Sequence, residues 1–159
     1  LYLAADSNSS GHRTIINALH EVHSIMAFTT LTALVNALDA MIVSGVVKSH
    51  ASPPNQMSTA ELPLKFIGFP SEETPIISFD STLGLRTASI ELITLIAPVL
   101  HNTNRVNFPL TILLMDNIHT ALKDNALLLG LDRWTSVLDT NQVGDTTYWS
   151  ITTTIFVSG

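Results

Sequence analysis

Two pairs of polar residues, each three positions apart, come closest to a metal-binding pattern in this sequence. His20 and His23 form one pair, and Asp116 and His119 form the other. Zinc proteases place two histidines four positions apart on a helix, so this spacing differs by one residue. Two helices that each carry such a pair could face each other and build a metal site, but sites of that kind need more glutamates than this chain offers. We therefore expect His20, His23 and His119 to bind no metal, and the chain to hold no cofactor.

Nucleophilic and acid–base catalysis find no better support. The chain has no cysteine, which removes thiolate nucleophiles, thiolate metal ligands and disulfides together. A Gly-x-Ser-x-Gly motif is also missing. Glu72 and Glu73 are the only adjacent carboxylates, and they fall on a predicted turn, where neighbouring side chains diverge into solvent. We assign no catalytic residue and favour a protein that is not an enzyme.

Nucleic acid is not an expected partner of this segment. Seven Lys and Arg residues are scattered singly, and thirteen acidic residues outnumber them to give a formal net charge of −6 at pH 7. Such a balance disfavours a surface built to neutralise phosphates. Tyr148 and Trp149 could stack on a base or a sugar, but aromatic residues in a strand more often belong to a core or an interface.

Composition favours one folded domain whose surface is poor in charge. Apolar residues make up 46% of the 159 residues and charged residues only 13%, while Ser, Thr and Asn together contribute 44 residues. This apolar content argues against disorder, and the length suits a single domain. The chain opens on Leu1 and not on Met. We expect residues 1–159 to be a single domain, possibly a segment of a longer chain.

Helical spacing of apolar residues predicts about four helices. The spacing continues on both sides of Thr29 and predicts one long helix or two over residues 13–48. Residues 80–82 could cap a third helix that ends near Pro98, and Pro109 and Gly130 are suited to open and close a fourth. Polar residues interrupt the apolar stretch over residues 22–40, so we expect no membrane span.

Short β-branched and aromatic runs predict the strands. Residues 62–69 and 74–79 would form two central strands joined by a turn over residues 70–73. Residues 134–138 and 146–157 would form a C-terminal hairpin around a turn at 139–145. In the last strand, the odd-numbered residues from Trp149 to Val157 would face the core. The fold class is α+β, predominantly helical, with short central strands and a C-terminal β-hairpin.

A structural subunit that assembles with copies of itself is the first functional hypothesis. Surfaces depleted in Lys and Glu resemble interface cores more than solvated faces. A viral capsid or coat, or a similar large homo-oligomer, would fit, and a capsid protein would reside in the virion; the localisation is otherwise unknown. No family resemblance supports this hypothesis. The expected contact surfaces are the free edge of the terminal strand and the outer side of the helix over residues 110–129. That helix carries four leucines that cannot all point inward: Leu113, Leu114, Leu127 and Leu128.

A small enzyme or ligand-binding domain is the alternative. Its apolar pocket would lie between the helices and the C-terminal hairpin, because ligand sites are concave and mostly apolar. Phe66, Phe69 and Trp149 are the residues expected to line it.

Overall fold

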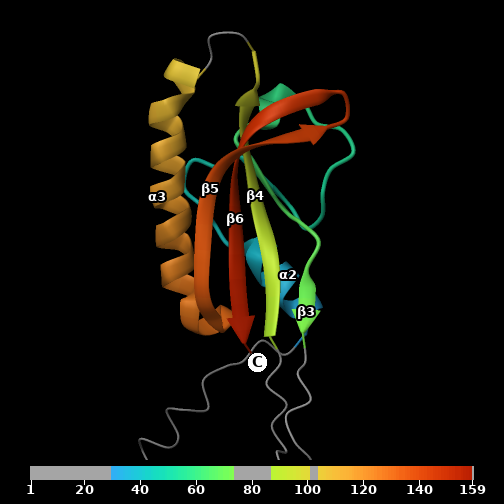
Figure 1. Ribbon diagram of the computed structural model, residues 1–159, viewed down its shortest axis with the longest axis vertical. Helices are drawn as coiled ribbons and strands as arrows, with labels where there is room; N and C mark the ends of the chain where they lie inside the picture. Colours follow the sequence, from blue (N-terminus) through green and yellow to red (C-terminus); the bar gives the residue numbers. More distant parts are fainter. Residues whose placement is uncertain (1–29, 74–86, 101–103, 159) are drawn as a thin grey trace, which may run out of the picture.

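Two α-helices cover one face of a mixed sheet of six strands in the part of the chain that the structure describes (Figure 1). The structure is a computed structural model, and it describes residues 30–73, 87–100 and 104–158. The helices are α2 (Leu31–Ala40) and α3 (Asn104–Leu129), with a short 3-10 helix, η1 (Thr59–Glu61). The strands are β1 (Lys48–His50), β2 (Leu64–Ile67), β3 (Ser71–Glu73), β4 (Thr87–Pro98), β5 (Leu131–Val143) and β6 (Thr146–Ser158). The prediction of a mostly helical chain with four helices is therefore wrong for these residues.

The sheet is built around β4 and β6. Its strand order is β1-β2-β4-β6-β5, and β3 pairs with the first residues of β4, beyond the end of β2. β1 and β2 run parallel, and every other pairing between these strands is antiparallel. The terminal strand β6 therefore lies inside the sheet, hydrogen-bonded to β4 and β5. The expectation that it has a free edge is wrong, because β4 pairs with the side of β6 that the hairpin leaves open.

Apolar residues are buried on both faces of the sheet. The larger cluster lies between the sheet and the two helices and is formed by Leu34, Leu38, Met41, Val43, Ile67, Ala88, Ile90, Leu92, Ile96, Leu114, Ile118, Ala121, Leu122, Leu129, Ile151, Ile155 and Val157. A smaller cluster lies on the opposite face and is formed by Leu64, Phe66, Ile93, Leu95, Val143 and Tyr148, with Met57 and Leu62 packed against it. The loop that carries η1 and the tip of the β5–β6 hairpin thus cover part of the face that the helices leave open.

The segment predicted as the third helix is the central strand β4. Its residues from Leu92 to Ile96 are all buried, because the strand has one core cluster on each face. A strand buried on both faces loses the alternation of apolar and polar residues that identifies a strand, and it becomes a continuous apolar run. Such a run also satisfies a helical spacing, which explains the wrong prediction.

The predictions for residues 13–79 are confirmed only in part. α2 lies within the first predicted helical segment, but residues 41–47 are not helical and residues 48–50 form β1. β2 confirms a strand within residues 62–69, whereas Ser71–Glu73, expected as a turn, is the strand β3. The remaining parts of these predictions, at residues 13–29 and 74–79, lie outside the described residues.

The C-terminal half agrees more closely with the sequence. α3 includes the predicted fourth helix but begins earlier, so Pro109 lies inside the helix and not at its first turn. The hairpin is confirmed, with a longer β5 and a tighter turn at Gly144–Asp145 than expected. The odd-numbered residues of β6 face the helices, as predicted. Among the described helices, none combines the length and the apolar character needed to cross a membrane.

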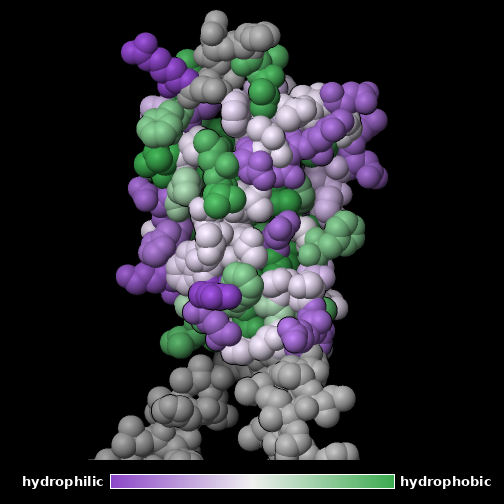
Figure 2. Space-filling view, viewed as in Figure 1, coloured by the Kyte–Doolittle hydropathy of each residue, from purple (hydrophilic) through white to green (hydrophobic). Residues whose placement is uncertain are grey.

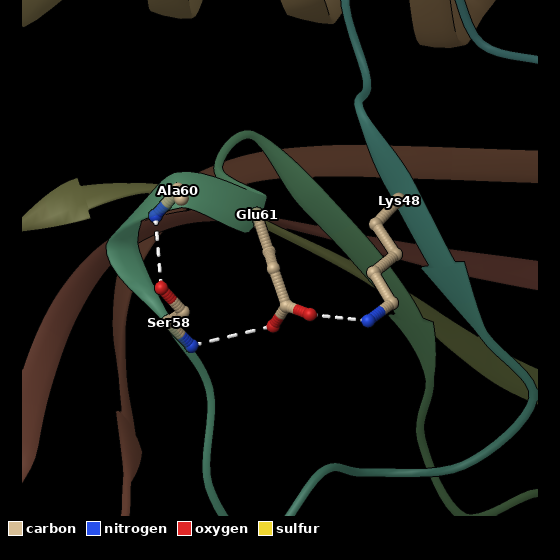
Figure 3. Close-up of polar contacts among 4 residues, drawn as sticks. All are labelled: Lys48, Ser58, Ala60 and Glu61. Carbon is tan, nitrogen blue, oxygen red and sulfur yellow. Dashed lines mark hydrogen bonds and ion pairs between the residues drawn. The ribbon is translucent and has the colours of Figure 1, made fainter.

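A capping box fixes the loop over the smaller core cluster (Figure 3). The Ala60 N–H donates to Ser58 Oγ at 3.3 Å, and the Ser58 N–H donates to Glu61 Oε2 at 3.3 Å. Lys48 Nζ on β1 donates to the other carboxylate oxygen of Glu61. This hydrogen bond from Lys48 holds the pKa of the Glu61 carboxyl below its ordinary value. The loop is thereby attached to the sheet at β1.

Gly130 connects α3 to β5 and generates the first prediction. Its φ of +62° lies in the left-handed region, which glycine adopts freely and which other residues adopt at a cost. We expect Gly130→Ala to lower the free energy of unfolding by about 1–2 kcal/mol in urea denaturation. Gly130→Asn is the control, because asparagine tolerates this conformation better than alanine does. Its loss in free energy of unfolding should be less than half of the loss in Gly130→Ala. Equal losses of unfolding free energy in the two variants would show that the positive φ of residue 130 does not determine the cost of substitution.

Candidate functional site

Of the three histidines considered as metal ligands, one lies among the described residues. His119, on α3, stacks against Trp134 of β5, with ring centroids 5.4 Å apart. His20 and His23 lie outside the described residues. Within the described ranges, no three His, Asp or Glu side chains come together in a way that could hold a metal ion.

Glu73 lines a pocket on the face of the sheet away from the helices. The pocket measures about 430 Å³ and is lined by Ser71, Glu73, Thr87, Ala88, Ser89, Asp132, Arg133, Phe156 and Val157. The Arg133 guanidinium lies over the Phe156 ring, 4.3 Å from its centroid, and Asp132 Oδ1 accepts from the Ser158 hydroxyl at 2.8 Å. Glu72 and Glu73 lie on β3, where successive side chains point to opposite faces. They do not form an acid–base pair.

A small pocket opens between the first turns of α3 and the hairpin. This α3–β5 pocket measures about 110 Å³ and is lined by Asn107, Phe108, Thr111, Leu138 and Trp149. Two nitrogen donors of its lining, Asn107 Nδ2 and Trp149 Nε1, are buried and have no hydrogen-bond acceptor. A buried donor without an acceptor costs about 1–3 kcal/mol. The pocket therefore combines apolar walls with two donors whose hydrogen bonds are not made within the chain.

Apolar side chains are exposed near both ends of α3, and between these two groups the exposed residues are polar: Asp116, His119, Thr120, Lys123 and Asp124. We call the apolar side chains the α3 stripe: Val106, Phe108, Ile112, Leu113, Leu127 and Leu128, each between 44% and 76% exposed. Figure 2 shows hydrophobic side chains gathered over the upper part of this helix. Three of the four leucines predicted to compete for the core thus point outward, and only Leu114 is buried. On the neighbouring edge strand, Val137 and Leu138 are about half exposed.

The three aromatic residues expected to line one pocket lie in three different places. Phe66 is buried in the smaller core cluster, on the face away from the helices. Phe69 is 88% exposed in the link between β2 and β3. Trp149 alone lines a pocket between a helix and the hairpin. The prediction of one shared pocket is wrong because Phe66 packs on one face of the sheet and Trp149 on the other.

Lys65 occupies a site that sequence reasoning missed. It lies on β2 with only 2% of its surface exposed, and its ammonium donates to the main-chain carbonyls of Leu38 at 2.7 Å and Asp39 at 2.8 Å. These carbonyls belong to the last turn of α2, where a helix has unpaired acceptors and a negative dipole end. The Ser49 hydroxyl, on β1, lies 2.5 Å from Asp39 Oδ1. The signal in the sequence was a single lysine within the apolar run Leu64–Ile67.

The Lys65 ammonium joins α2 to the sheet through two hydrogen bonds. Burial lowers its pKa to about 8, from an ordinary 10.5, while the Asp39 carboxylate opposes part of that shift. The adjoining pocket measures about 170 Å³, and Asp39, Lys48 and Ser49 contribute its polar lining. Since two of the three ammonium protons are donated to the end of α2, the main effect of Lys65 is to attach this helix to the sheet.

Comparison with known proteins does not assign the chain to a family. No family model matches it, and no curated protein matches it. The functional argument therefore rests on the surfaces described above.

The pKa of Lys65 generates the second prediction. Because the folded protein holds this proton less tightly than the unfolded chain does, the charged ammonium destabilises the fold below about pH 8. As the pH rises from about 8 to 10.5, the wild type should gain stability relative to Lys65→Met, by up to about 3 kcal/mol. Urea denaturation of both proteins across this range measures their free energies of unfolding. The difference between the two values cancels the contributions of the titrating groups that both proteins share. A difference that stays constant from pH 7 to 10.5 would contradict the prediction.

Proposed function

We propose that this chain is a structural subunit that assembles with copies of itself, without catalytic activity, into a shell, a coat or a similar large homo-oligomer. The observation that carries the proposal is the α3 stripe. Six large apolar side chains lie on the outer side of one helix, although the chain buries a full core beneath that same helix.

The energetic support comes from the cost of exposed apolar surface. Each Å² of apolar surface removed from water contributes about 25 cal/mol, so covering the α3 stripe is favourable. Exposed apolar patches on folded chains mark contact sites, and four members of the α3 stripe, Val106, Phe108, Ile112 and Leu113, lie within about two turns of one another. The low content of charged residues agrees with this, since contact surfaces are depleted in Lys and Glu.

The edge strand β5 gives a second line of support. It is 13 residues long and pairs with β6 on one side, and no described strand pairs with its other side. Exposed edges are usually protected by charged side chains, by proline, by bulges or by a short length. β5 carries charged residues and an irregular pairing near its start, but from Trp134 to Leu138 it has neither charge nor proline, and Val137 and Leu138 are half exposed there. Such an edge suits a strand whose outer side is covered by another copy.

The pockets favour assembly over the ligand-binding alternative. The pocket between α3 and the hairpin has a volume of about 110 Å³, well below the roughly 300–1,000 Å³ of typical ligand sites. The larger pocket on the open face carries Arg133 and Asp132, which already contact Phe156 and Ser158. In the pocket beside Lys65, the Ser49 hydroxyl donates to Asp39 and the Lys65 ammonium donates to the end of α2, so these polar groups are already paired within the chain.

A charge introduced into the α3 stripe provides the third prediction. Leu113 is 55% exposed, so Leu113→Glu should fold normally but place an ion in the contact. In sedimentation velocity at micromolar concentration, we expect the wild type to sediment as an assembly and Leu113→Glu as a monomer. Circular dichroism and the Tm of the variant should stay close to those of the wild type.

The matched control places the same added charge elsewhere. Gln56→Glu, at an exposed position of the loop on the other side of the sheet, should assemble like the wild type. A wild-type chain that is a folded monomer under these conditions would refute the proposed function.

A further inference from the structure

The free side of β5 carries a row of backbone groups that no described strand pairs. β5 joins β6 through a two-residue turn at Gly144–Asp145, so Val143 and Thr146 form the hydrogen-bonded pair that closes the hairpin. Hydrogen-bonded pairs alternate along antiparallel strands, and the even-numbered residues of β5 therefore direct their N–H and C=O groups away from β6. The Thr140 N–H agrees with this, because it donates to Asp139 Oδ1 at 2.7 Å and not to β6.

Part of this edge is open on both faces of the sheet. Residues 137–140 of β5 are all exposed, although successive residues of a strand point to opposite faces. Neither α3 nor the loop that carries η1 therefore covers the strand there. A partner strand can reach the backbone groups of this segment.

One side of α3 lies next to the same edge (Figure 1). His119 stacks on Trp134 of β5, and Phe108 lines a pocket together with Leu138 of β5. Ile112 lies one helical turn after Phe108 and two turns before His119, so it belongs to the same side of the helix. Phe108 is 61% exposed and Ile112 is 44% exposed. A strand added to β5 would cover both side chains.

A second copy of β5 fits this edge by length and by charge. β5 has 13 residues, whereas β1 and β3 have three each. Antiparallel pairing about a two-fold axis at Ser136 sets Arg133 opposite Asp139 of the second copy, and the symmetry creates this pair twice. Directly opposite residues must share a sheet face, so Asp132 can face neither Arg133 nor Asp139, and only this register joins opposite charges. The Arg133 guanidinium lies over the Phe156 ring and has no ion pair within the described residues.

We propose that β5 of one copy pairs antiparallel with β5 of a second copy about a two-fold axis at Ser136, so that the two sheets become continuous. This inference rests on the proposed function and specifies one contact of the assembly. The register also sets Trp134 opposite Leu138 of the second copy, on the face that carries the helices. Because the axis is perpendicular to the sheet, the α3 helices of both copies lie side by side on that face. The contact closes a pair, and a larger assembly joins such pairs through other surfaces.

Single cysteines test the register in the full chain, which has no cysteine of its own. Ser136→Cys sets two thiols opposite each other, with Cα atoms about 5.5 Å apart, a separation that a disulfide spans. After mild oxidation of the assembled protein, we expect a disulfide-linked dimer on a non-reducing gel. The matched control is Thr140→Cys, on the same sheet face and exposed. It lies opposite Asp132 of the second copy and should give no linked dimer.

Charge reversal tests the pairing independently. Arg133→Glu and Asp139→Arg each create two like-charge pairs, and we expect each to weaken association about tenfold in sedimentation velocity. An equimolar mixture of the two variants restores opposite charges at both positions and should associate like the wild type. Asp145→Arg is the matched control, because Asp145 is exposed in the hairpin turn, outside the pairing, and this variant should associate normally. All variants should keep the circular dichroism spectrum of the wild type.

The outcomes separate this inference from the proposed function. A wild-type chain that assembles, while Ser136→Cys gives no more linked dimer than Thr140→Cys, overturns the inference and leaves self-assembly intact. A mixture of Arg133→Glu and Asp139→Arg that associates no better than either variant alone also overturns it. A wild-type chain that remains monomeric in sedimentation velocity overturns both.

Discussion

Burial of β4 on both faces is the constraint on which the rest of the structure depends. The strand pairs with β2 and β3 on one side and with β6 on the other, so its backbone groups are satisfied within the sheet. Its side chains then need cover above and below. The helices provide it on one face, and the η1 loop and the hairpin tip provide it on the other. Lys65 and the Lys48–Glu61 pair attach these two covers to the sheet, because each joins a covering segment to β1 or β2.

How far the sequence predicts this fold depends on how many faces of an element are buried. In β6, Thr152 and Thr154 alternate with Ile151 and Ile155, and this alternation correctly predicted both the strand and its inner face. In β4, apolar residues fill both faces, the alternation disappears, and a helix was predicted. Gly130 was read correctly because its positive φ is a local requirement. Local signals and one-sided burial can thus be read from the chain, whereas two-sided burial depends on covering segments far away in sequence.

The candidate site was less predictable than the fold, for a similar reason. The α3–β5 pocket joins Asn107 of a helix to Leu138 and Trp149 of two strands, and no spacing along the chain reveals that meeting. Its two unpaired donors become visible only when every nearby acceptor is known. The outward orientation of part of the α3 stripe, by contrast, was predictable from helical geometry, because consecutive leucines cannot all face one core. The exposed stripe could be predicted, but not the pocket beside it.

The placement of both helices on one face also explains why apolar surface remains exposed. A helix over a sheet buries one side and presents the other to solvent, and in α3 that outer side is apolar near both ends and polar between them. An apolar stripe alone would associate without a defined geometry, since the hydrophobic effect has no direction. Under the proposed function, the α3 stripe would contribute free energy of association, and the unpaired backbone groups on the free side of β5 would add direction, because hydrogen bonds form only with a partner at a particular position.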